Sequence, residues 1–292
     1  MDLLQLKYFQ TVARTEHMTQ AARELQIAQP ALSMTIARLE EDLGVPLFDR
    51  KKRRIVLNKY GNAFLKKVNL ALTTLDEGLR EITDLAGLEH GCVSIASTIL
   101  NRRFCDFLGS FITVYPNISF RISQISNDET KVQLLEAGEV DFCFISTMIA
   151  CPNLAYIPLK TEEFVLAVKP DHRLASRHTI NLWEVANDPF ISLKADHSLR
   201  KFCDELCKRA GFTPNIICEC DEPAAIGNLV NAGLGVALLS ATAIKEQSPS
   251  LISLNIKDPC CNRTLQLAWN EKRYFSKAAL QFREYVIQHF AG

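Results

Sequence analysis

Apolar residues near the start of the chain recur at the spacing of a helix. They follow one another at steps of four, three and four residues and so share one face: Leu32, Ile36, Leu39 and Leu43. Pro30 suits the first turn of this helix, where its missing N–H needs no partner, and Gly44 ends it. A shorter helix precedes it, from an N-cap at Thr19 to about Leu25. The two helices predict a helix-turn-helix unit whose second helix enters the major groove of DNA.

Five consecutive cations follow at residues 50–54. Apolar residues flank them on both sides, so a hairpin fits, with Phe48 on the outgoing strand and Ile55 on the returning one. A basic run by itself is usually a solvated surface, but beside a recognition helix it would lie along the phosphate backbone. The side chains expected to contact DNA are Thr19, Gln29, Pro30, Ser33, Met34, Thr35, Arg38, Arg50, Lys51, Lys52, Arg53 and Arg54.

Helical periodicity continues through a long segment from Lys59 to about Ala86. Its apolar residues fall at steps of three and four, which approximates the seam of a coiled coil. Packing against its own domain is one explanation, but no adjacent segment offers an obvious partner surface, so pairing with a second copy is favoured. The residues expected at this seam are Phe64, Val68, Leu72, Leu75, Leu79 and Ile82. A homodimer would present two recognition helices to two half-sites.

From residue 91 onward, short apolar strands alternate with amphipathic helices at βαβ spacing, which favours a mostly parallel sheet. The alternation pauses and resumes, so two α/β lobes with a hinged cleft between them are expected. In such sheets, ligands bind beyond the carboxyl ends of the strands. The predicted domains are residues 1–58 (winged helix-turn-helix), 59–87 (linker helix) and 88–292, with lobe I at about 91–161 and 265–292 and lobe II at about 162–264.

Charge and composition narrow the class of protein. Of the 292 residues, 48% are hydrophobic and 23% charged, as in ordinary globular proteins. The formal net charge is zero, so a specific binder with one basic corner is favoured over a general nucleic-acid coat. No apolar run approaches the roughly 18–20 residues needed to span a bilayer, and the first residues do not resemble a secretion signal. We therefore expect a cytoplasmic protein with no membrane partner.

Ten cysteines are present, but none forms a Cys-x-x-Cys pair or a zinc-type cluster with histidine. Buried free thiols in a reducing compartment are the favoured explanation, and neither a metal ion nor a cofactor is expected. The sequence also lacks a nucleotide-binding glycine loop, a nucleophile elbow and a zinc-protease motif, so no catalytic role is expected. A solute-binding receptor would explain the two lobes but not the first 90 residues.

Two motifs resemble those of LysR-type transcriptional regulators: residues 29–33 with 38–50, and residues 229–239. The resemblance implies an α/β protein with a winged helix-turn-helix, a dimerising linker helix and a two-lobed effector domain like periplasmic binding proteins. It also implies a homotetramer and a small, commonly anionic effector that changes how double-stranded promoter DNA is occupied. RNA polymerase is a further partner of such a regulator. The sequence departs from the family pattern at Ala28 and at Met34-Thr35, so the operator sequence stays open.

In this family, three segments converge on the cleft: the ends of two strands and the start of a helix, whose amides attract anions. The effector-binding residues expected from this resemblance are Ser97, Thr98, Ser146, Thr147, Lys194, His197 and Ser198. Ordinary helix caps are the competing explanation for these serines. A thiol-redox regulator is the alternative function, because peroxide sensors of this family carry a reactive cysteine where this chain has Ser198. Cys207 lies near their resolving cysteine, and Cys203 would be a poor nucleophile without a nearby cation.

Overall fold

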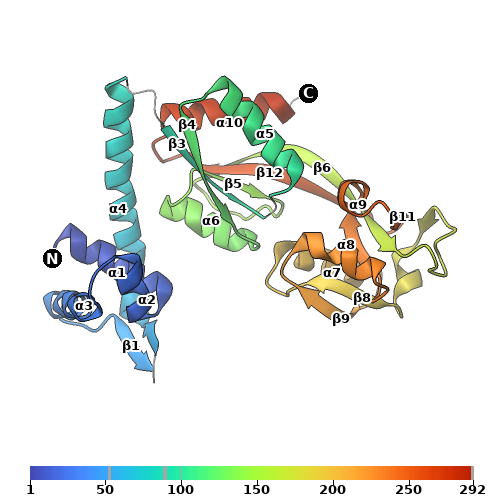
Figure 1. The fold of residues 1–292 in the computed structure, drawn as a ribbon, viewed down its shortest axis with the longest axis horizontal. Coiled ribbons are helices and arrows are strands. Elements are labelled where there is room, and N and C mark those ends of the chain that lie inside the picture. Colours follow the sequence, from blue (N-terminus) through green and yellow to red (C-terminus); the bar gives the residue numbers. More distant parts are fainter. Residues whose placement is uncertain (52–53, 88–90, 99, 291–292) are drawn as a thin grey trace. The chain divides into compact units, whose positions relative to one another are not determined.

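The structure is a computed structural model that describes residues 1–51, 54–87, 91–98 and 100–290. The chain forms two compact units, Met1–Glu89 with Glu136–Glu139, and His90–Leu135 with Val140–Gly292 (Figure 1). We call them the N-terminal and C-terminal units. Among the described residues, no helix is long and apolar enough to cross a membrane.

The N-terminal unit is a helical bundle with a two-stranded wing. Its elements are α1 (Leu3–Thr15), α2 (Met18–Glu24), α3 (Gln29–Leu43), β1 (Phe48–Lys51), β2 (Arg54–Leu57) and α4 (Lys59–Leu85). The sequence predicts only two helices before the wing, and the structure adds α1. Asp2 and Gln5 form a reciprocal capping box at its start, and Phe9 and Val12 are fully buried on its inner face. α1 therefore completes the core on which α2, α3 and α4 pack.

The predicted boundaries of the recognition helix are confirmed, but the predicted N-cap of α2 is wrong. α3 begins at Gln29 with Pro30 in its first turn and ends at Gly44, whose φ is 72°. The cap of α2 is His17 rather than Thr19: its Nδ1 accepts a hydrogen bond from the Gln20 N–H at 3.3 Å. α1 ends in a left-handed residue, Glu16, which brings His17 to the cap position. Thr19 instead lies in the exposed first turn.

The C-terminal unit contains an eight-stranded sheet and a separate pair of strands. Its elements are β3 (Gly91–Ser97), α5 (Arg102–Val114), β4 (Ile118–Gln124), α6 (Asp128–Ala137), β5 (Phe142–Ile145), β6 (Leu154–Val168), β7 (Thr179–Ile180), η1 (Leu182–Val185), β8 (Pro189–Leu193), α7 (Ser198–Arg209), β9 (Asn215–Cys220), α8 (Pro223–Asn231), β10 (Ala237–Ser240), α9 (Ala241–Gln247), β11 (Ile252–Ile256), β12 (Asn262–Asn270) and α10 (Lys277–Phe290). The sheet order is β4-β3-β5-β12-β6-β11-β7, with β10 also paired to β6.

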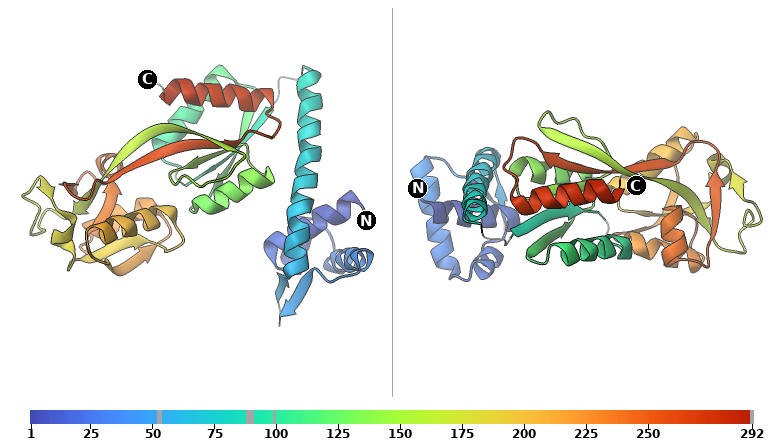
Figure 2. Two further views of the ribbon diagram at one scale, coloured as in Figure 1. Left: turned by 180° about the vertical axis from the view of Figure 1, so that it is seen from behind. Right: turned by 90° about the horizontal axis from the view of Figure 1, so that it is seen from above.

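The expectation of a mostly parallel sheet is wrong, because the sheet is mixed. β3 pairs with β4 and β5 in parallel, whereas β6 pairs antiparallel with β12, β10 and β11. β6 has 15 residues, although the sequence predicts a strand only over residues 164–168. Its earlier part is interrupted by Pro158 and by a polar run over residues 160–163, and most of its residues there are only half-buried or exposed, which concealed the strand from hydropathy. β6 and β12 both run from one lobe to the other (Figure 2).

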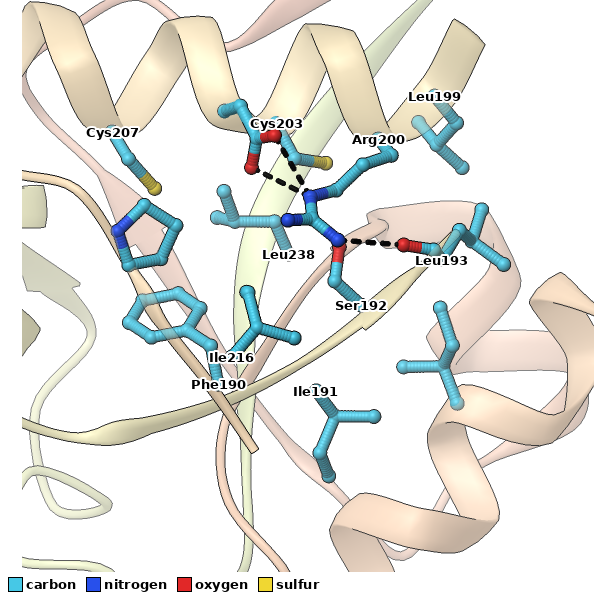
Figure 3. A pocket seen from close by; sticks show the side chains of 13 residues that line it. Phe190, Ile191, Ser192, Leu193, Leu199, Arg200, Cys203, Cys207, Ile216 and Leu238 are labelled. Atoms are coloured by element: carbon cyan, nitrogen blue, oxygen red, sulfur yellow. Dashed lines mark hydrogen bonds and ion pairs between the residues drawn. The ribbon is translucent and has the colours of Figure 1, made fainter. Parts of the chain in front are cut away.

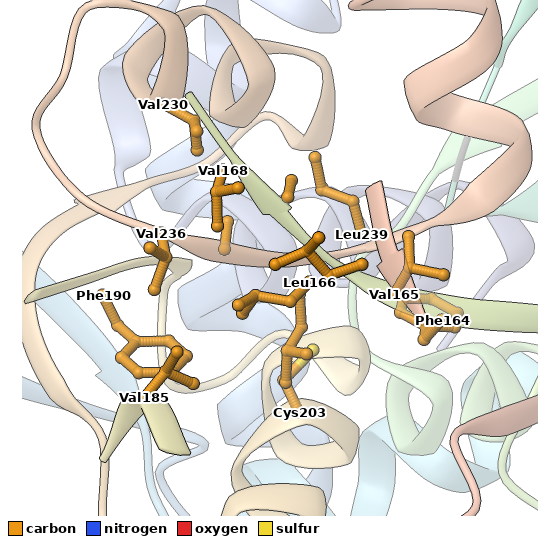
Figure 4. Close-up of a cluster of buried hydrophobic side chains, with 14 of the residues drawn as sticks. Phe164, Val165, Leu166, Val168, Val185, Phe190, Cys203, Val230, Val236 and Leu239 are labelled. Carbon is orange, nitrogen blue, oxygen red and sulfur yellow. The ribbon is translucent and has the colours of Figure 1, made fainter. Parts of the chain in front are cut away.

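Each lobe has its own hydrophobic core. In lobe I the alternation along β5 sends Phe142 and Phe144 to one face, where α5 and α10 pack (Figure 1). Cys143 and Ile145 point to the other face and meet Val132 of α6 and its neighbours. In lobe II the second half of β6 is buried on both faces between β8, β10 and the surrounding helices (Figure 4). The two long paired strands β6 and β12, which we call the crossing strands, thus connect the two cores.

Candidate nucleic-acid interface and interlobe cavity

The recognition helix α3 separates a buried face from a solvent face. Leu32, Ile36 and Leu39 are at most 3% exposed. The residues predicted to contact DNA from α3 occupy the other side: Gln29, Pro30, Met34 and Arg38 are exposed, and Ser33 and Thr35 are half-buried. The Thr35 hydroxyl donates to the Ala31 carbonyl at 2.9 Å, so its proton serves the helix itself.

The predicted wing is present as an antiparallel hairpin, with Phe48 opposite Leu57 and Lys51 opposite Arg54. Glu40 of α3 anchors it, because its Oε1 accepts from the Leu47 N–H at 2.7 Å and from the Phe48 N–H at 3.3 Å. Arg50, Lys51 and Arg54 belong to the two strands, while Lys52 and Arg53 lie outside the described residues.

The linker helix α4 divides the six residues predicted for the dimer seam into two groups. Val68 and Leu72 are only 2% and 7% exposed and, with Phe64, they pack into the core of the N-terminal unit beside α1. The prediction that these three residues face a second copy is wrong, since α1 supplies the partner surface that the sequence did not reveal. Leu75, Leu79 and Ile82 are 52%, 64% and 65% exposed, and Leu85 continues them. We call these four residues the α4 stripe.

Two adjoining cavities lie between the lobes of the C-terminal unit. The larger, of about 420 Å³, is lined by Thr98, Gln124, Ser126, His197, Asp221, Glu222 and Pro223. A second, of about 130 Å³, shares Thr98, Gln124, Glu222 and Pro223 with it and extends to Leu100, Asn101, Glu162, Phe164, Leu199, Ala224, Leu239, Ser240, Thr242, Ala243, Gln247 and Arg263. Together they are large enough for a small metabolite.

The structure brings only part of the predicted effector set to these cavities. Thr98 and His197 line them, whereas Ser97, Ser146, Thr147, Lys194 and Ser198 are absent from both linings. Ser97 is buried in β3. Lys194 is exposed and pairs with Asp221, whose carboxylate oxygens lie 2.7 and 2.8 Å from its Nζ. Ser198 and the pair Ser146-Thr147 bind instead to the chain's own Asp128.

Asp128 and Lys131 form a fully buried ion pair behind the cavity. Lys131 Nζ donates to Asp128 Oδ1 at 2.8 Å, to the Phe144 carbonyl at 2.8 Å and to the Thr98 hydroxyl oxygen. Burial lowers the pKa of Lys131, while the pKa of Asp128 is lowered by Lys131 and by the Ser146 N–H against the opposing effect of burial. Since all three Lys131 protons have acceptors, the pair is satisfied without a ligand.

Asp128 also joins the lobes. Its Oδ2 accepts from the N–H and hydroxyl of Ser146 and from the Thr147 N–H at 3.0–3.2 Å, where an anionic ligand was expected. Its own N–H donates to the Ser198 hydroxyl of lobe II at 2.7 Å. This network was not predicted from the sequence. A signal was present, because Asp128 and Lys131 share a helix face with the apolar Leu135, and charged side chains on a buried face need partners.

His197 is buried at the start of α7, where its Nδ1 accepts from the Leu199 N–H at 3.1 Å. Burial, followed by the nearby Arg263 and Lys131, lowers its pKa from 6.5 to about 4. The imidazole is therefore neutral at pH 7, chiefly because it is removed from water.

A further cavity, of about 10 Å³, lies inside lobe II and has room for about one water molecule (Figure 3). Cys203 and Cys207 of α7 line it, and burial raises the pKa of both thiols, that of Cys207 to about 12. Both are therefore protonated and unreactive at neutral pH. Within the described ranges, no group of three or more His, Cys, Asp or Glu could hold a metal ion.

A winged helix-turn-helix joined to a two-lobed domain with an interlobe cavity defines a DNA-binding transcriptional regulator. Residues 3–62 match the bacterial regulatory helix-turn-helix protein family lysR, and residues 89–291 match the LysR substrate binding domain. The chain belongs to the LysR family of transcriptional regulators, whose members are DNA-binding regulators rather than enzymes.

Full-length relatives agree with this assignment. The uncharacterized HTH-type transcriptional regulator YybE of Bacillus subtilis is 40% identical over 293 residues, covering 100% of both chains. The transcriptional dual regulator GltC of the same organism is 32% identical, covering 100% of this chain and 98% of the relative. The crystal structure of CbnR, a LysR family transcriptional regulator, superposes with a TM-score of 0.70 at 24% identity over 99% of each chain, which confirms the predicted fold class.

Proposed function

We propose that this protein is a sequence-specific regulator of transcription in the cytoplasm, whose occupancy of promoter DNA is changed by a small anionic effector in the interlobe cavity. The observation that carries the DNA-binding half is the solvent face of α3. Its exposed Gln29, Met34 and Arg38 oppose a fully buried apolar face, and a basic wing follows directly. Gln29 and Ser33 read bases, while Thr19 and the wing cations hold the phosphate backbone.

The effector half is supported by the chemistry of the cavity lining. Burial keeps His197 uncharged, and the guanidinium of Arg263 brings a positive charge to the lining of the adjoining cavity. Thr98 accepts a hydrogen bond from Lys131, so its hydroxyl proton is available to an oxygen acceptor on the ligand. Three of the other predicted residues, Ser146, Thr147 and Ser198, form hydrogen bonds with Asp128 and are not assigned to the ligand.

The exposed α4 stripe supports a homodimer, because four large apolar side chains in one row on a long helix are costly to leave in water. Two dimers then form a homotetramer, as the family resemblance implies, and RNA polymerase is the further partner at the promoter.

The redox alternative is disfavoured by the thiols themselves. A peroxide sensor needs a thiolate, yet burial raises the pKa of Cys203 and Cys207, and Ser198 stands at the start of α7. If peroxide shifts the DNA footprint of the reduced protein and a reductant restores it, the thiol alternative replaces the small-molecule proposal.

Two sets of substitutions test DNA binding in the full chain. Replacing Arg50, Lys51 and Arg53 by Gln should weaken binding to operator and random DNA alike, and flatten the log–log salt slope by about 0.9 per lost phosphate contact. Replacing Gln29 and Ser33 by Ala should reduce the preference for operator, by about 1–3 kcal/mol for a lost bidentate base contact. Fluorescence anisotropy at several salt concentrations measures both, and an unchanged slope or an unchanged preference contradicts the corresponding assignment.

A further inference from the structure

Arg263 lines the smaller interlobe cavity and, within the described part of the chain, has no hydrogen-bonded acceptor. It lies on the crossing strand β12, opposite Glu162 of β6, and its side chain is partly buried. Its guanidinium stands over the Phe202 ring, 5.9 Å from the ring centre. Among the described residues, no acceptor forms a hydrogen bond or an ion pair with this guanidinium, and burial lowers the pKa of Arg263.

Arg200 shows how the same lobe treats an arginine with a structural role. Its side chain is 12% exposed. Its Nε lies 2.8 Å from both Asp204 carboxylate oxygens, and its Nη1 lies 2.8 Å from the Leu193 carbonyl (Figure 3). The same Nη1 also lies 2.8 Å from Glu219 Oε1. The contrast is informative, because a guanidinium removed from water without acceptors destabilises the fold.

A ligand acid group would supply the missing acceptors. A guanidinium presents five N–H donors in a planar fork that fits a carboxylate or phosphate with two parallel hydrogen bonds. Thr98 lines the same cavity, and its hydroxyl can donate a third hydrogen bond to the acid group of the ligand. Lys131 is excluded from this role, because Asp128, Phe144 and Thr98 take its three protons.

The rest of the lining limits how much negative charge a ligand can carry. Glu162 and Glu222 line the smaller cavity, and Arg263 is the single cation among the described residues of that lining. Asp221 adds a carboxylate to the larger cavity, where Lys194 pairs with it. A second acid group on the ligand would thus meet carboxylates rather than cations. Like charges brought together in a partly desolvated cavity repel strongly.

We propose that Arg263 is the counter-ion of the effector's acid group, and that the effector carries one acid group on an uncharged or cationic remainder. The inference rests on the proposed effector function and deepens it by naming the ligand class and the residue that selects it. No step of it depends on the DNA-binding assignment.

The first test needs no effector. Arg263→Met removes the unpaired charge, so the unfolding temperature of the free full-length protein should rise by about 2–4 °C. The matched control is Arg200→Met, which leaves Asp204 and Glu219 without their partner and should lower the unfolding temperature. If Arg263→Met lowers the unfolding temperature as Arg200→Met does, Arg263 is structural and the proposal is overturned.

The second test uses simple anions as probes. At ionic strength matched with sodium chloride, sodium acetate should raise the unfolding temperature of the parent chain by more than that of Arg263→Met. Sodium succinate, with two acid groups, should produce a smaller Arg263-dependent rise than acetate. An equal rise from acetate in both proteins overturns the role of Arg263, and a larger Arg263-dependent rise from succinate overturns the single-acid class. Failure of the parent chain to bind DNA would refute the proposed function and leave these outcomes unchanged.

Discussion

Individual buried ionisable groups gather where the two lobes meet, and each has a distinct electrostatic role. Asp128 and Lys131 form an ion pair, and His197 stays uncharged. Among the described residues Arg263 has no hydrogen-bonded or ion-paired acceptor, although the charges of Asp128 and Glu162 favour its charged form. A protein stabilised only for folding would bury apolar residues here, because even a well-paired buried ion pair is often no more stabilising than an apolar pair. Of these groups, Arg263 is the one whose burial the proposed ligand site explains.

His197 predicts a pH dependence of stability. Its pKa is about 4 in the folded protein and about 6.5 when unfolded, so only the unfolded chain binds the proton between these values. The free energy of unfolding therefore falls as pH decreases from about 6.5 to about 4, by about 1.4 kcal/mol per pH unit from this group.

The variant His197→Asn isolates this contribution, because Asn also caps helices but does not titrate. Urea unfolding at pH 7, 6 and 5 should show a weaker loss of stability in the variant than in the parent chain. If both proteins lose stability in parallel, folding does not lower the pKa of His197 and the proposed pH dependence is wrong.

At the scale of elements, α4 gives the sharpest prediction. Replacing Leu75 and Leu79 by Glu should bring like charges together across the twofold axis and separate the dimer. Operator affinity should then fall by about 10²–10⁴-fold, because each recognition helix would bind its half-site alone.

Sedimentation and anisotropy measure these two effects. Thr74→Glu is the control, since it adds a single carboxylate at an exposed position on a different face of α4. The α4 stripe would be excluded from the dimer interface if the double variant sediments as a dimer, or if Thr74→Glu dissociates it equally.

Elements with a strong internal period could be predicted from the sequence, and those defined by distant partners could not. The pattern located α3, the wing, α4 and most α/β elements, because capping residues and apolar spacing are local. It missed α1 and therefore assigned Val68 and Leu72 to a partner chain. It also missed the mixed sheet, since β6 finds its partner β12 about a hundred residues later.

The cavity shows the same limit. Thr98 and His197 were expected there because the family resemblance places the end of a strand and the start of a helix at the cleft, and both of these positions can be located in the sequence. Arg263 could not be anticipated, because its significance lies in having no partner, and only three-dimensional contacts reveal an absence of that kind.

At the scale of the whole molecule, lobe II is continuous in sequence, and both of its ends lie on the paired strands β6 and β12. Glu163 and Asn262 are direct partners in that pair. The nearly one hundred residues between them therefore start and end at neighbouring positions of the sheet. The core of lobe II contains none of the buried side chains of the lobe I core. Topologically, lobe II is an insert at the tip of a β-hairpin.

Because of this topology, lobe II can be deleted by joining the two strands that flank it. Replacing residues 164–261 by Asn-Gly would connect Glu163 to Asn262 and convert the crossing strands into a hairpin with a two-residue turn. The excised protein should retain a cooperative unfolding transition by circular dichroism, carried by the phenylalanine-rich core around Phe111 and Phe282. A transition without cooperativity would show that the lobes fold only together. If the excised protein folds cooperatively, the end of this hairpin is a position at which lobe II could be replaced by the corresponding lobe of another family member. The chimaera would keep its DNA-binding unit and respond to a different effector.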